Sequence, residues 1–329
     1  MAKQKLRVEK QIKRFVRDQI SRQEKLNEKE KMSPLMQAIK AVHSVAAAGD
    51  SLSEEDLKRQ RAGQDLFSKL ATPPIGVSSR PVMVDEIKCE FTDQDLGHDK
   101  RHVILYCHGG GYTCGSINYA RILASKLSIH TGLSVFSFEY RLAPENPYPA
   151  ALKDALQVWD YLMMLGYGAK DTVVAGDSAG GNLALELCLG LKKQRRLLPC
   201  ALVLMSPWTD MTMSGFSYEE CLNIDPMLTP DYIRACRRAY AGDADYKSPD
   251  LSPIFADLED FPPTLIQVGT NEILKSDSEL LAEKLTGQGV FSKLEIYEDS
   301  WHVFQQMPLR RSSKALSQAA DFIGRVIYD

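Results

Sequence analysis

The sequence predicts an α/β fold, in which helices cover both faces of a mostly parallel sheet. Short β-branched runs alternate with helical stretches along most of the 329 residues. Strands that alternate with helices are typical of parallel sheets, because the connecting helices pack on the faces. A hydrophobic share of 44% and a charged share of 25% are those of a globular protein with a large core.

The β-branched runs predict where the strands lie. They fall at about 82–92, 103–107, 133–139, 172–176, 201–205, 264–268 and 293–297. Helical spacing of apolar residues predicts helices near 149–165, 180–192, 277–287 and 312–327. These helices connect the later strands, as a sheet covered on both faces requires.

Residues 1–72 are predicted to be helical and to precede the sheet. Apolar residues recur at helical spacing over 8–20, and Ser53 followed by three acidic residues is typical of a helix start. The pair Pro73-Pro74 ends this segment. We therefore separate residues 1–72 from a larger domain, residues 73–329.

The segment 208–262 interrupts the alternation of strands and helices. It is rich in Met, Asp, Pro and Tyr and contains one clear helix near 230–240. We interpret it as an insertion above the sheet.

Charge and hydropathy exclude several classes of protein. The net charge is −3, and basic residues are interleaved with acidic ones, so we expect no nucleic-acid partner. No stretch reaches the roughly 18 apolar residues of a membrane span, and the charged start lacks the apolar core of a signal peptide. We therefore expect a cytoplasmic protein without a membrane span.

The seven cysteines are scattered along the chain and form no C-x-x-C pair. This pattern is typical of a reducing compartment. It argues against structural disulfides and against a zinc site.

A serine lies at a predicted turn between a strand and a helix. Gly176-Asp177-Ser178-Ala179-Gly180 follows an apolar strand directly and precedes a helical run. A glycine-bracketed serine also occurs in ordinary loops, but the strand before it and the helix after it favour the nucleophile elbow. At such a turn the flanking residues must be small, and the Ser178 hydroxyl is held clear of the sheet.

The sequence His108-Gly109-Gly110-Gly111 follows the buried strand 103–107. Fixed backbone N–H donors stabilise the negative oxygen that forms when a serine attacks a carbonyl. We expect Gly109 and Gly110 to supply two such donors, and Ala179 to supply the third. A flexible glycine linker is the alternative, and the preceding core strand argues against it. We assign His108 to bracing this loop.

The general base follows by elimination. The chain has six histidines, and only His302 lies after Ser178. Where a serine lies on a strand-to-helix elbow, the acid and the histidine follow it in the chain. A histidine beside Trp301 would by default be a packed core residue. Its place after the predicted last strand instead indicates a proton acceptor for Ser178.

These motifs together resemble those of the hormone-sensitive-lipase-like branch of the α/β hydrolases, the microbial family IV carboxylesterases. The resemblance covers about residues 100–325. It includes His108-Gly-Gly-Gly-Tyr112, Tyr140-Arg-Leu-Ala-Pro-Glu-Asn-Pro-Tyr-Pro149, Gly176-Asp-Ser-Ala-Gly-Gly181 and Asp225-Pro226-Met227.

The resemblance implies an α/β-hydrolase fold with an eight-stranded sheet and no cofactor. It also implies that residues 1–72 form a helical cap over the active site of the catalytic domain, residues 73–329. A dimerisation arm is the alternative for this segment, so a homodimer stays open. The activity implied is the hydrolysis of small esters with short to medium acyl chains, through a serine acyl-enzyme.

The catalytic acid departs from the family pattern, which commonly reads Asp-Pro-Leu after the seventh strand. This chain instead reads Asn271-Glu272-Ile273-Leu274 after the run 264–269. Glu272 aligns with the family aspartate and is placed at the end of a strand, so we expect it to hold His302. Asp277 is the alternative, although Ser276-Asp277 also looks like the cap of the next helix.

Two other functions remain open at this point. An acyltransferase would use the same site and transfer the acyl group to an alcohol or amine. A ligand receptor on the hydrolase fold would use the cleft without chemistry, but the retained serine, histidine and carboxylate argue against it.

Overall fold

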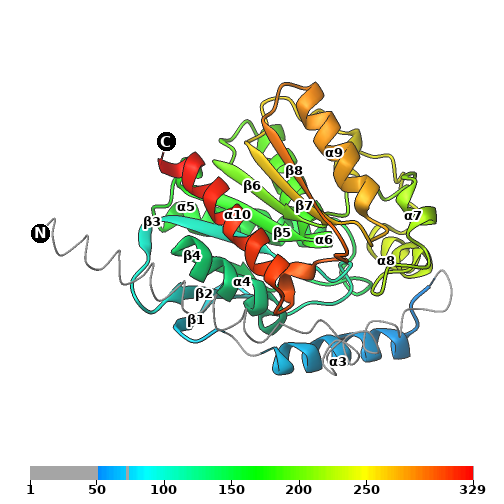
Figure 1. Cartoon of the computed structure of the whole chain (residues 1–329), viewed down its shortest axis with the longest axis horizontal. Helices are drawn as coiled ribbons and strands as arrows, with labels where there is room; N and C mark the ends of the chain where they lie inside the picture. Colours follow the sequence, from blue (N-terminus) through cyan, green and yellow to red (C-terminus); the bar gives the residue numbers. More distant parts are fainter. Residues whose placement is uncertain (1–50, 72–73, 329) are drawn as a thin grey trace, which may run out of the picture.

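The computed structural model describes residues 51–71 and 74–328 (Figure 1). In this part of the chain, eight strands form one sheet in the order β1-β2-β4-β3-β5-β6-β7-β8. The predicted eight-stranded, mostly parallel sheet with helices on both faces is therefore confirmed. The helix predicted over 8–20 lies outside the described residues.

The sheet is parallel from β4 to β8, and β1 and β2 are antiparallel to their neighbours. The strands are β1 (Val77–Val84), β2 (Ile87–Gln94), β3 (Asp99–Cys107), β4 (Leu133–Phe138), β5 (Thr172–Asp177), β6 (Ala201–Met205), β7 (Thr264–Gly269) and β8 (Ser292–Tyr297). The single run predicted at 82–92 is in fact a hairpin, because the chain turns at Asp85, where φ is 49°.

The helices near 149–165, 180–192, 230–240, 277–287 and 312–327 are all present. The helices are α3 (Glu54–Leu70), α4 (Ile117–Thr131), α5 (Ala150–Met164), α6 (Ala179–Lys193), α7 (Ser217–Glu220), α8 (Pro230–Ala241), α9 (Lys275–Gly287) and α10 (Arg310–Tyr328). Sequence reasoning missed α4, which begins at the cap Ser116 and ends at Gly132. Most of its side chains are buried, so it has no clear apolar stripe.

Helices cover both faces of the sheet (Figure 1). Along β3, Ile104 and Tyr106 pack with α4 and α10 on one face. Val103 and Leu105 pack with α5, α6 and α9 on the other. Both faces are thus apolar, as a central parallel strand requires.

Helix α3 is anchored across the carboxyl-terminal end of the sheet. Ser53 and Asp56 form a reciprocal capping box at its start. The Arg61 guanidinium donates to both carboxylate oxygens of Glu145, at 2.7 and 2.8 Å, and to the carbonyl oxygen of Thr113 at 2.9 Å. These bonds hold the helix beside the loop that follows β3.

The segment 208–262 contains α7, α8 and the short 3-10 helix Pro253–Phe255. Figure 1 shows α7 and α8 grouped beyond the ends of β7 and β8. Among the described residues, none of the helices combines the length and apolar character that crossing a bilayer demands.

Candidate active site

Five parallel strands end at one edge of the sheet, and each is followed by a residue of the site. The loop 108–116 follows β3, Ser178 follows β5, Ser206 follows β6, Glu272 follows β7, and His302 follows β8. Ligands of open α/β sheets bind at this carboxyl-terminal edge. The topology thus brings together side chains far apart in the sequence.

Ser178 lies on a strained turn between β5 and α6. Its backbone has φ 54° and ψ −122°, which L-residues rarely adopt. A Cβ at Gly176 would lie 2.2 Å from the carbonyl oxygen of Gly180, and a Cβ at Gly180 would lie 2.1 Å from that of Cys107. Both flanking positions therefore require glycine, as the elbow motif predicts.

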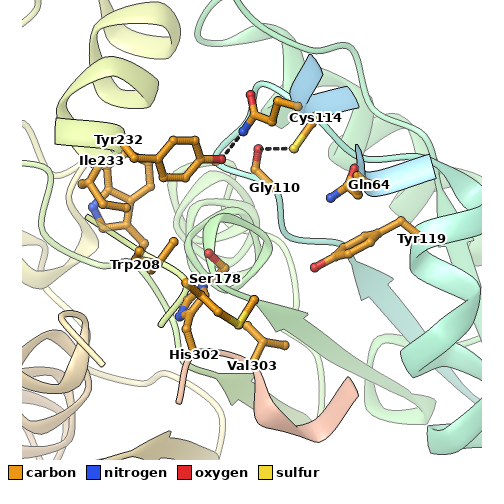
Figure 2. Close-up of a pocket in the computed structure, with 14 residues that line it drawn as sticks. Gln64, Gly110, Cys114, Tyr119, Ser178, Trp208, Tyr232, Ile233, His302 and Val303 are labelled. Carbon is orange, nitrogen blue, oxygen red and sulfur yellow. Dashed lines mark hydrogen bonds between the residues drawn. The ribbon is translucent and has the colours of Figure 1, made fainter. Parts of the chain in front are cut away.

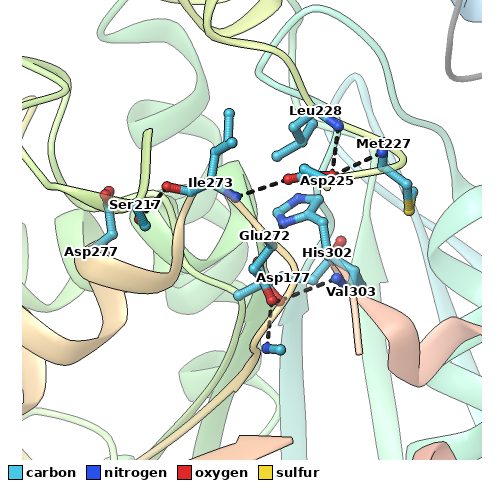
Figure 3. Close-up of polar contacts among 12 residues, drawn as sticks. Asp177, Ser217, Asp225, Met227, Leu228, Glu272, Ile273, Asp277, His302 and Val303 are labelled. Atoms are coloured by element: carbon cyan, nitrogen blue, oxygen red, sulfur yellow. Dashed lines mark hydrogen bonds and ion pairs between the residues drawn. The ribbon is translucent and has the colours of Figure 1, made fainter. Parts of the chain in front are cut away.

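His302 lies against Glu272 in the loop after β8 (Figure 3). Its Nδ1 is 2.9 Å from Glu272 Oε2, and the glutamate is fully buried. A carboxylate at Nδ1 fixes the ring so that Nε2 can accept a proton. The structure thus brings His302 together with the carboxylate that was expected to hold it.

The second oxygen of Glu272 has two further donors. Oε1 accepts the N–H of Gly269 at 2.6 Å and the hydroxyl of Ser206 at 2.9 Å. Ser206 Oγ in turn accepts the N–H of Val303 at 3.1 Å, so this serine joins the acid to the histidine loop. Sequence reasoning missed Ser206, because only its place directly after the apolar strand β6 can be read from the sequence, and that place does not reveal its partners.

Asp277, the alternative acid, lies in a different environment. Its Oδ2 accepts the backbone N–H groups of Thr209 and Asp210, at 2.8 and 2.9 Å. Burial and the neighbouring Asp210 charge raise the pKa of Asp277 to about 8. Figure 3 shows it on α9, pointing away from His302. Asp277 therefore braces the insertion.

The glycine loop after β3 differs from the prediction at one position. The N–H of Gly109 donates to Asp177 Oδ1 at 2.9 Å, so it is not free to bind a substrate oxygen. Gly110 and Gly111 line the pocket instead, and within the described residues their N–H groups donate to no acceptor. The expectation that Gly109 is an oxyanion donor is corrected on this ground.

His108, the first residue of the glycine motif, supports the loop and packs against Tyr140. His108 is fully buried, stacks on Tyr140 with ring centroids 4.2 Å apart, and donates from Nδ1 to the carbonyl oxygen of Gly109 at 2.8 Å. Burial lowers the pKa of His108 to about 4, so the ring is neutral at physiological pH. His108 therefore braces the loop.

Asp225, from the Asp-Pro-Met motif, connects the insertion to the acid loop. Its Oδ2 accepts the N–H of Ile273 at 2.9 Å, and its Oδ1 accepts the N–H groups of Met227 and Leu228 at 2.8 and 3.0 Å. Burial raises the pKa of Asp225 to about 6, while the nearby His302 lowers it. This carboxyl fixes two pocket residues relative to Glu272.

A cavity of about 60 Å³ opens above Ser178 and His302 (Figure 2). Trp208, Tyr232 and Ile233 lie on one side of it, and Gln64 and Tyr119 lie on the other. Its full lining is Gln60, Gln64, Gly110, Gly111, Cys114, Tyr119, Ser178, Trp208, Met227, Leu228, Tyr232, Ile233, His302 and Val303. Helix α3, the insertion and the loops of the sheet thus share one pocket.

The described residues contain no group of three or more His, Cys, Asp or Glu side chains placed to hold a metal ion. The seven cysteines all lie in this part of the chain as free thiols.

Comparison with known proteins gives a consistent result. The model of a family described as alpha/beta hydrolase fold matches residues 104–306. An esterase of Acinetobacter venetianus is 35% identical over 254 residues, which are 75% of this chain and 82% of the relative. An acetyl-hydrolase of Streptomyces hygroscopicus is 33% identical over 241 residues, covering 73% of this chain and 79% of the relative.

A solved structure extends the likeness to a larger share of the chain. The crystal structure of an esterase from the bacterial hormone-sensitive lipase family superposes with a TM-score of 0.83 at 29% identity. It covers 89% of this chain and 98% of the other.

An elbow serine and a carboxylate-bound histidine at the carboxyl ends of a mostly parallel sheet define a hydrolase of the α/β class. The chain belongs to the α/β-hydrolase family, in its hormone-sensitive-lipase-like branch. The resemblance in the sequence motifs is thereby confirmed.

Proposed function

We propose that this protein is a serine carboxylesterase in which Ser178 is the nucleophile, His302 the general base and Glu272 the acid. The observation that carries the proposal is the 2.9 Å contact between His302 Nδ1 and the buried Glu272, since His302 also lines the pocket that Ser178 lines. The esterases and acetyl-hydrolase among its relatives support the reaction.

The reaction follows from the roles of these groups. His302 Nε2 takes the hydroxyl proton as Ser178 Oγ attacks the ester carbonyl, and it returns that proton to the departing alcohol. Water then attacks the acyl-enzyme with the same base, which releases the carboxylic acid and regenerates Ser178. Glu272 stabilises the imidazolium in both steps.

The oxyanion is proposed to be bound by the N–H groups of Gly110, Gly111 and Ala179. The two glycines line the pocket, and Ala179 is the first residue of α6, where N–H groups have no partner within the helix. Loss of one such donor costs roughly 3 kcal/mol in the barrier. Gly111 replaces Gly109 in this assignment.

The acyl chains accepted are proposed to be short. The cavity above Ser178 is small, about 60 Å³ in volume, and Trp208 and Tyr232 are among the bulky side chains that line it. Acetyl to butyryl groups suit a cavity of this kind better than longer chains do. The name of the Streptomyces relative, an acetyl-hydrolase, agrees with this short end of the range.

The cap role of residues 1–72 is also part of the proposal. Gln60 and Gln64 of α3 line the pocket, as do Trp208, Met227 and Tyr232 of the insertion. Both segments therefore shape the substrate site. A shortened chain beginning at Pro73 that kept its full acyl-chain preference would contradict the cap role, and loss of dimers in that chain would favour an arm.

The cytoplasmic location is proposed from the seven unpaired thiols, which a reducing compartment maintains. Transfer of the acyl group to an alcohol instead of water is the competing reaction. Product analysis with added alcohols separates the two, since an acyltransferase forms the new ester in preference to the free acid.

The function is tested by labelling and by kinetics. An organophosphate should modify Ser178 alone, and Ser178→Ala should abolish hydrolysis of p-nitrophenyl esters while leaving the melting temperature nearly unchanged. Across esters of increasing acyl length, kcat/KM should be highest at about two to four carbons and fall for longer chains. Labelling at another serine, or turnover by the alanine variant, would overturn the assignment.

A further inference from the structure

Asp177 is a buried carboxyl beside the nucleophile that the reaction steps above do not use. It ends β5, directly before Ser178, and its side chain is fully buried. Oδ1 accepts the hydroxyl of Tyr106 from β3 and the N–H of Gly109, and Oδ2 accepts the hydroxyl of Tyr119 from α4 at 3.3 Å. One carboxyl thus joins three elements around the pocket.

The contact with Gly109 requires a close approach of the backbone. A Cβ at Gly109 would lie 2.3 Å from Asp177 Oδ2, so no larger residue fits there. The next two residues turn sharply, with φ of 119° at Gly110 and 61° at Gly111. With the Gly109 N–H directed at the carboxyl, the chain turns so that Gly110 and Gly111 border the pocket.

A second branch of the network leads to the histidine loop. The Tyr119 hydroxyl accepts from Gln306 Nε2 at 2.5 Å, and Gln306 belongs to the 3-10 helix Phe304–Gln306, which begins two residues after His302. Tyr119 also lines the pocket. Asp177 is therefore connected both to the glycine loop and to the segment that carries His302.

Burying this carboxyl carries a desolvation cost, which its hydrogen bonds offset. Desolvation raises the pKa of Asp177 to about 6, against the opposing effects of Tyr106, Gly109, His302 and Tyr119. A buried polar group of this kind is costly unless its hydrogen bonds are satisfied. Three donors satisfy the Asp177 carboxyl. One of them, Tyr119, lines the pocket, and another, Gly109, directly precedes the pocket residue Gly110.

We propose that Asp177 is a positioning residue whose carboxyl holds Gly109, so that the N–H groups of Gly110 and Gly111 face the developing oxyanion. This inference rests on the carboxylesterase function proposed above. Asp177 acts through the loop and touches no substrate atom. Its loss should therefore weaken binding of the transition state more than binding of the ester.

The test compares Asp177→Ala with Asp177→Asn, with Glu186→Gln as the control. Glu186 is an equally buried carboxyl on α6 that accepts the Tyr240 hydroxyl and lies outside the pocket lining. For each variant, kcat and KM are measured with p-nitrophenyl butyrate. The inhibition constant is measured with an alkyl trifluoromethyl ketone, which Ser178 converts to a tetrahedral oxyanion.

Removing a single oxyanion donor lowers kcat by about 10²–10³, so the displaced loop of Asp177→Ala should lower it by about 10². KM should change by less than about threefold, and the ketone inhibition constant should rise in parallel with the fall in kcat. Asp177→Asn keeps an oxygen acceptor for Gly109 and should recover most of the activity. Glu186→Gln should leave the ketone inhibition constant unchanged.

A folded Asp177→Ala enzyme with kcat and ketone affinity within about threefold of the parent would overturn the proposal. If the alanine variant does not fold, Asp177→Asn decides. Unchanged ketone affinity supports the role of the acceptor oxygen, and a loss beyond about tenfold contradicts it. Failure of the proposed function is recognised separately, because the parent chain itself would then show neither ester turnover nor labelling at Ser178.

Discussion

Replacing Glu272 by Gln should nearly abolish turnover while changing the shape of the site very little. The carboxylate accepts three hydrogen bonds, from His302 Nδ1, from the Ser206 hydroxyl and from the Gly269 N–H. An amide has only one oxygen. In one orientation the NH₂ group of the amide faces His302 and opposes the Nδ1 hydrogen. In the other orientation the NH₂ group faces the Ser206 hydroxyl and the Gly269 N–H.

In both orientations His302 loses the anion that stabilises its protonated form. Replacement of a triad carboxylate by its amide lowers kcat by about 10³–10⁴, which corresponds to about 4–5 kcal/mol in the barrier. Since Glu272 is about 30 residues from His302 in sequence but 2.9 Å away in space, the effect comes through this one contact. KM should change little.

Asp277→Asn is the matched control for this experiment. The pKa of Asp277 is raised to about 8, so its carboxyl carries a proton at neutral pH, and an amide has the same shape and charge. Its Oδ2 bonds to Thr209 and Asp210 can be made by the amide oxygen. We expect kcat within about threefold of the parent.

Both variants are assayed with p-nitrophenyl butyrate after their folding has been checked by thermal unfolding. A Glu272→Gln enzyme with near-normal kcat, beside an inactive Asp277→Asn enzyme, would refute the reasoning and move the role of the acid to Asp277. Near-normal kcat in both variants would show that neither carboxylate supports His302.

Further predictions concern stability and the support of the acid. Because the pKa of Asp277 lies above its ordinary value of 3.8, the folded state binds this proton more tightly, and the parent loses stability as pH rises towards 8. Urea unfolding should therefore show Asp277→Asn gaining stability relative to the parent as the pH rises from about 4 to about 8, and levelling off above. Gly180→Ala should unfold at a clearly lower temperature or not fold, since its Cβ would meet the carbonyl oxygen of Cys107 at 2.1 Å; an unchanged melting curve would contradict the geometry of the elbow. Ser206→Ala should lower kcat by about tenfold without changing KM, because Glu272 loses one of its donors, and steady-state kinetics would disprove this role if kcat were unchanged.

The sequence was most informative where the chemistry is local. The elbow around Ser178 could be predicted because the strand, the turn and the helix are consecutive. Any such turn requires small residues beside the serine, and Gly176 and Gly180 meet that requirement. The strands from β4 to β7 were found for a similar reason, since each is a short buried run. Helix α4 was missed because its buried side chains leave no periodic polar face.

Prediction was weaker where partners come from distant segments. Strand order alone placed Glu272 at the correct edge of the sheet, and its contact with His302 needed only that β7 and β8 be neighbours. Ser206 could not be given a role in this way. Its hydroxyl matters only because β6 lies beside β7 and because the backbone of Val303 turns towards it.

The glycine loop shows most clearly why a sequence motif does not by itself determine which of its residues has which function. Three consecutive glycines offer three N–H groups, and nothing local to the loop distinguishes the first from the second. Asp177 makes this distinction, because its carboxylate accepts a hydrogen bond from the Gly109 N–H. Asp177 ends β5, which lies beside β3 in the sheet. Because the same pairing places Cys107 beside Gly176, the strand register that forms the elbow also decides which glycines border the pocket. The elbow at Ser178 and the glycine loop are therefore positioned by a single strand pairing, and the Asp177 carboxyl is proposed to link that pairing to the orientation of the Gly110 and Gly111 N–H groups.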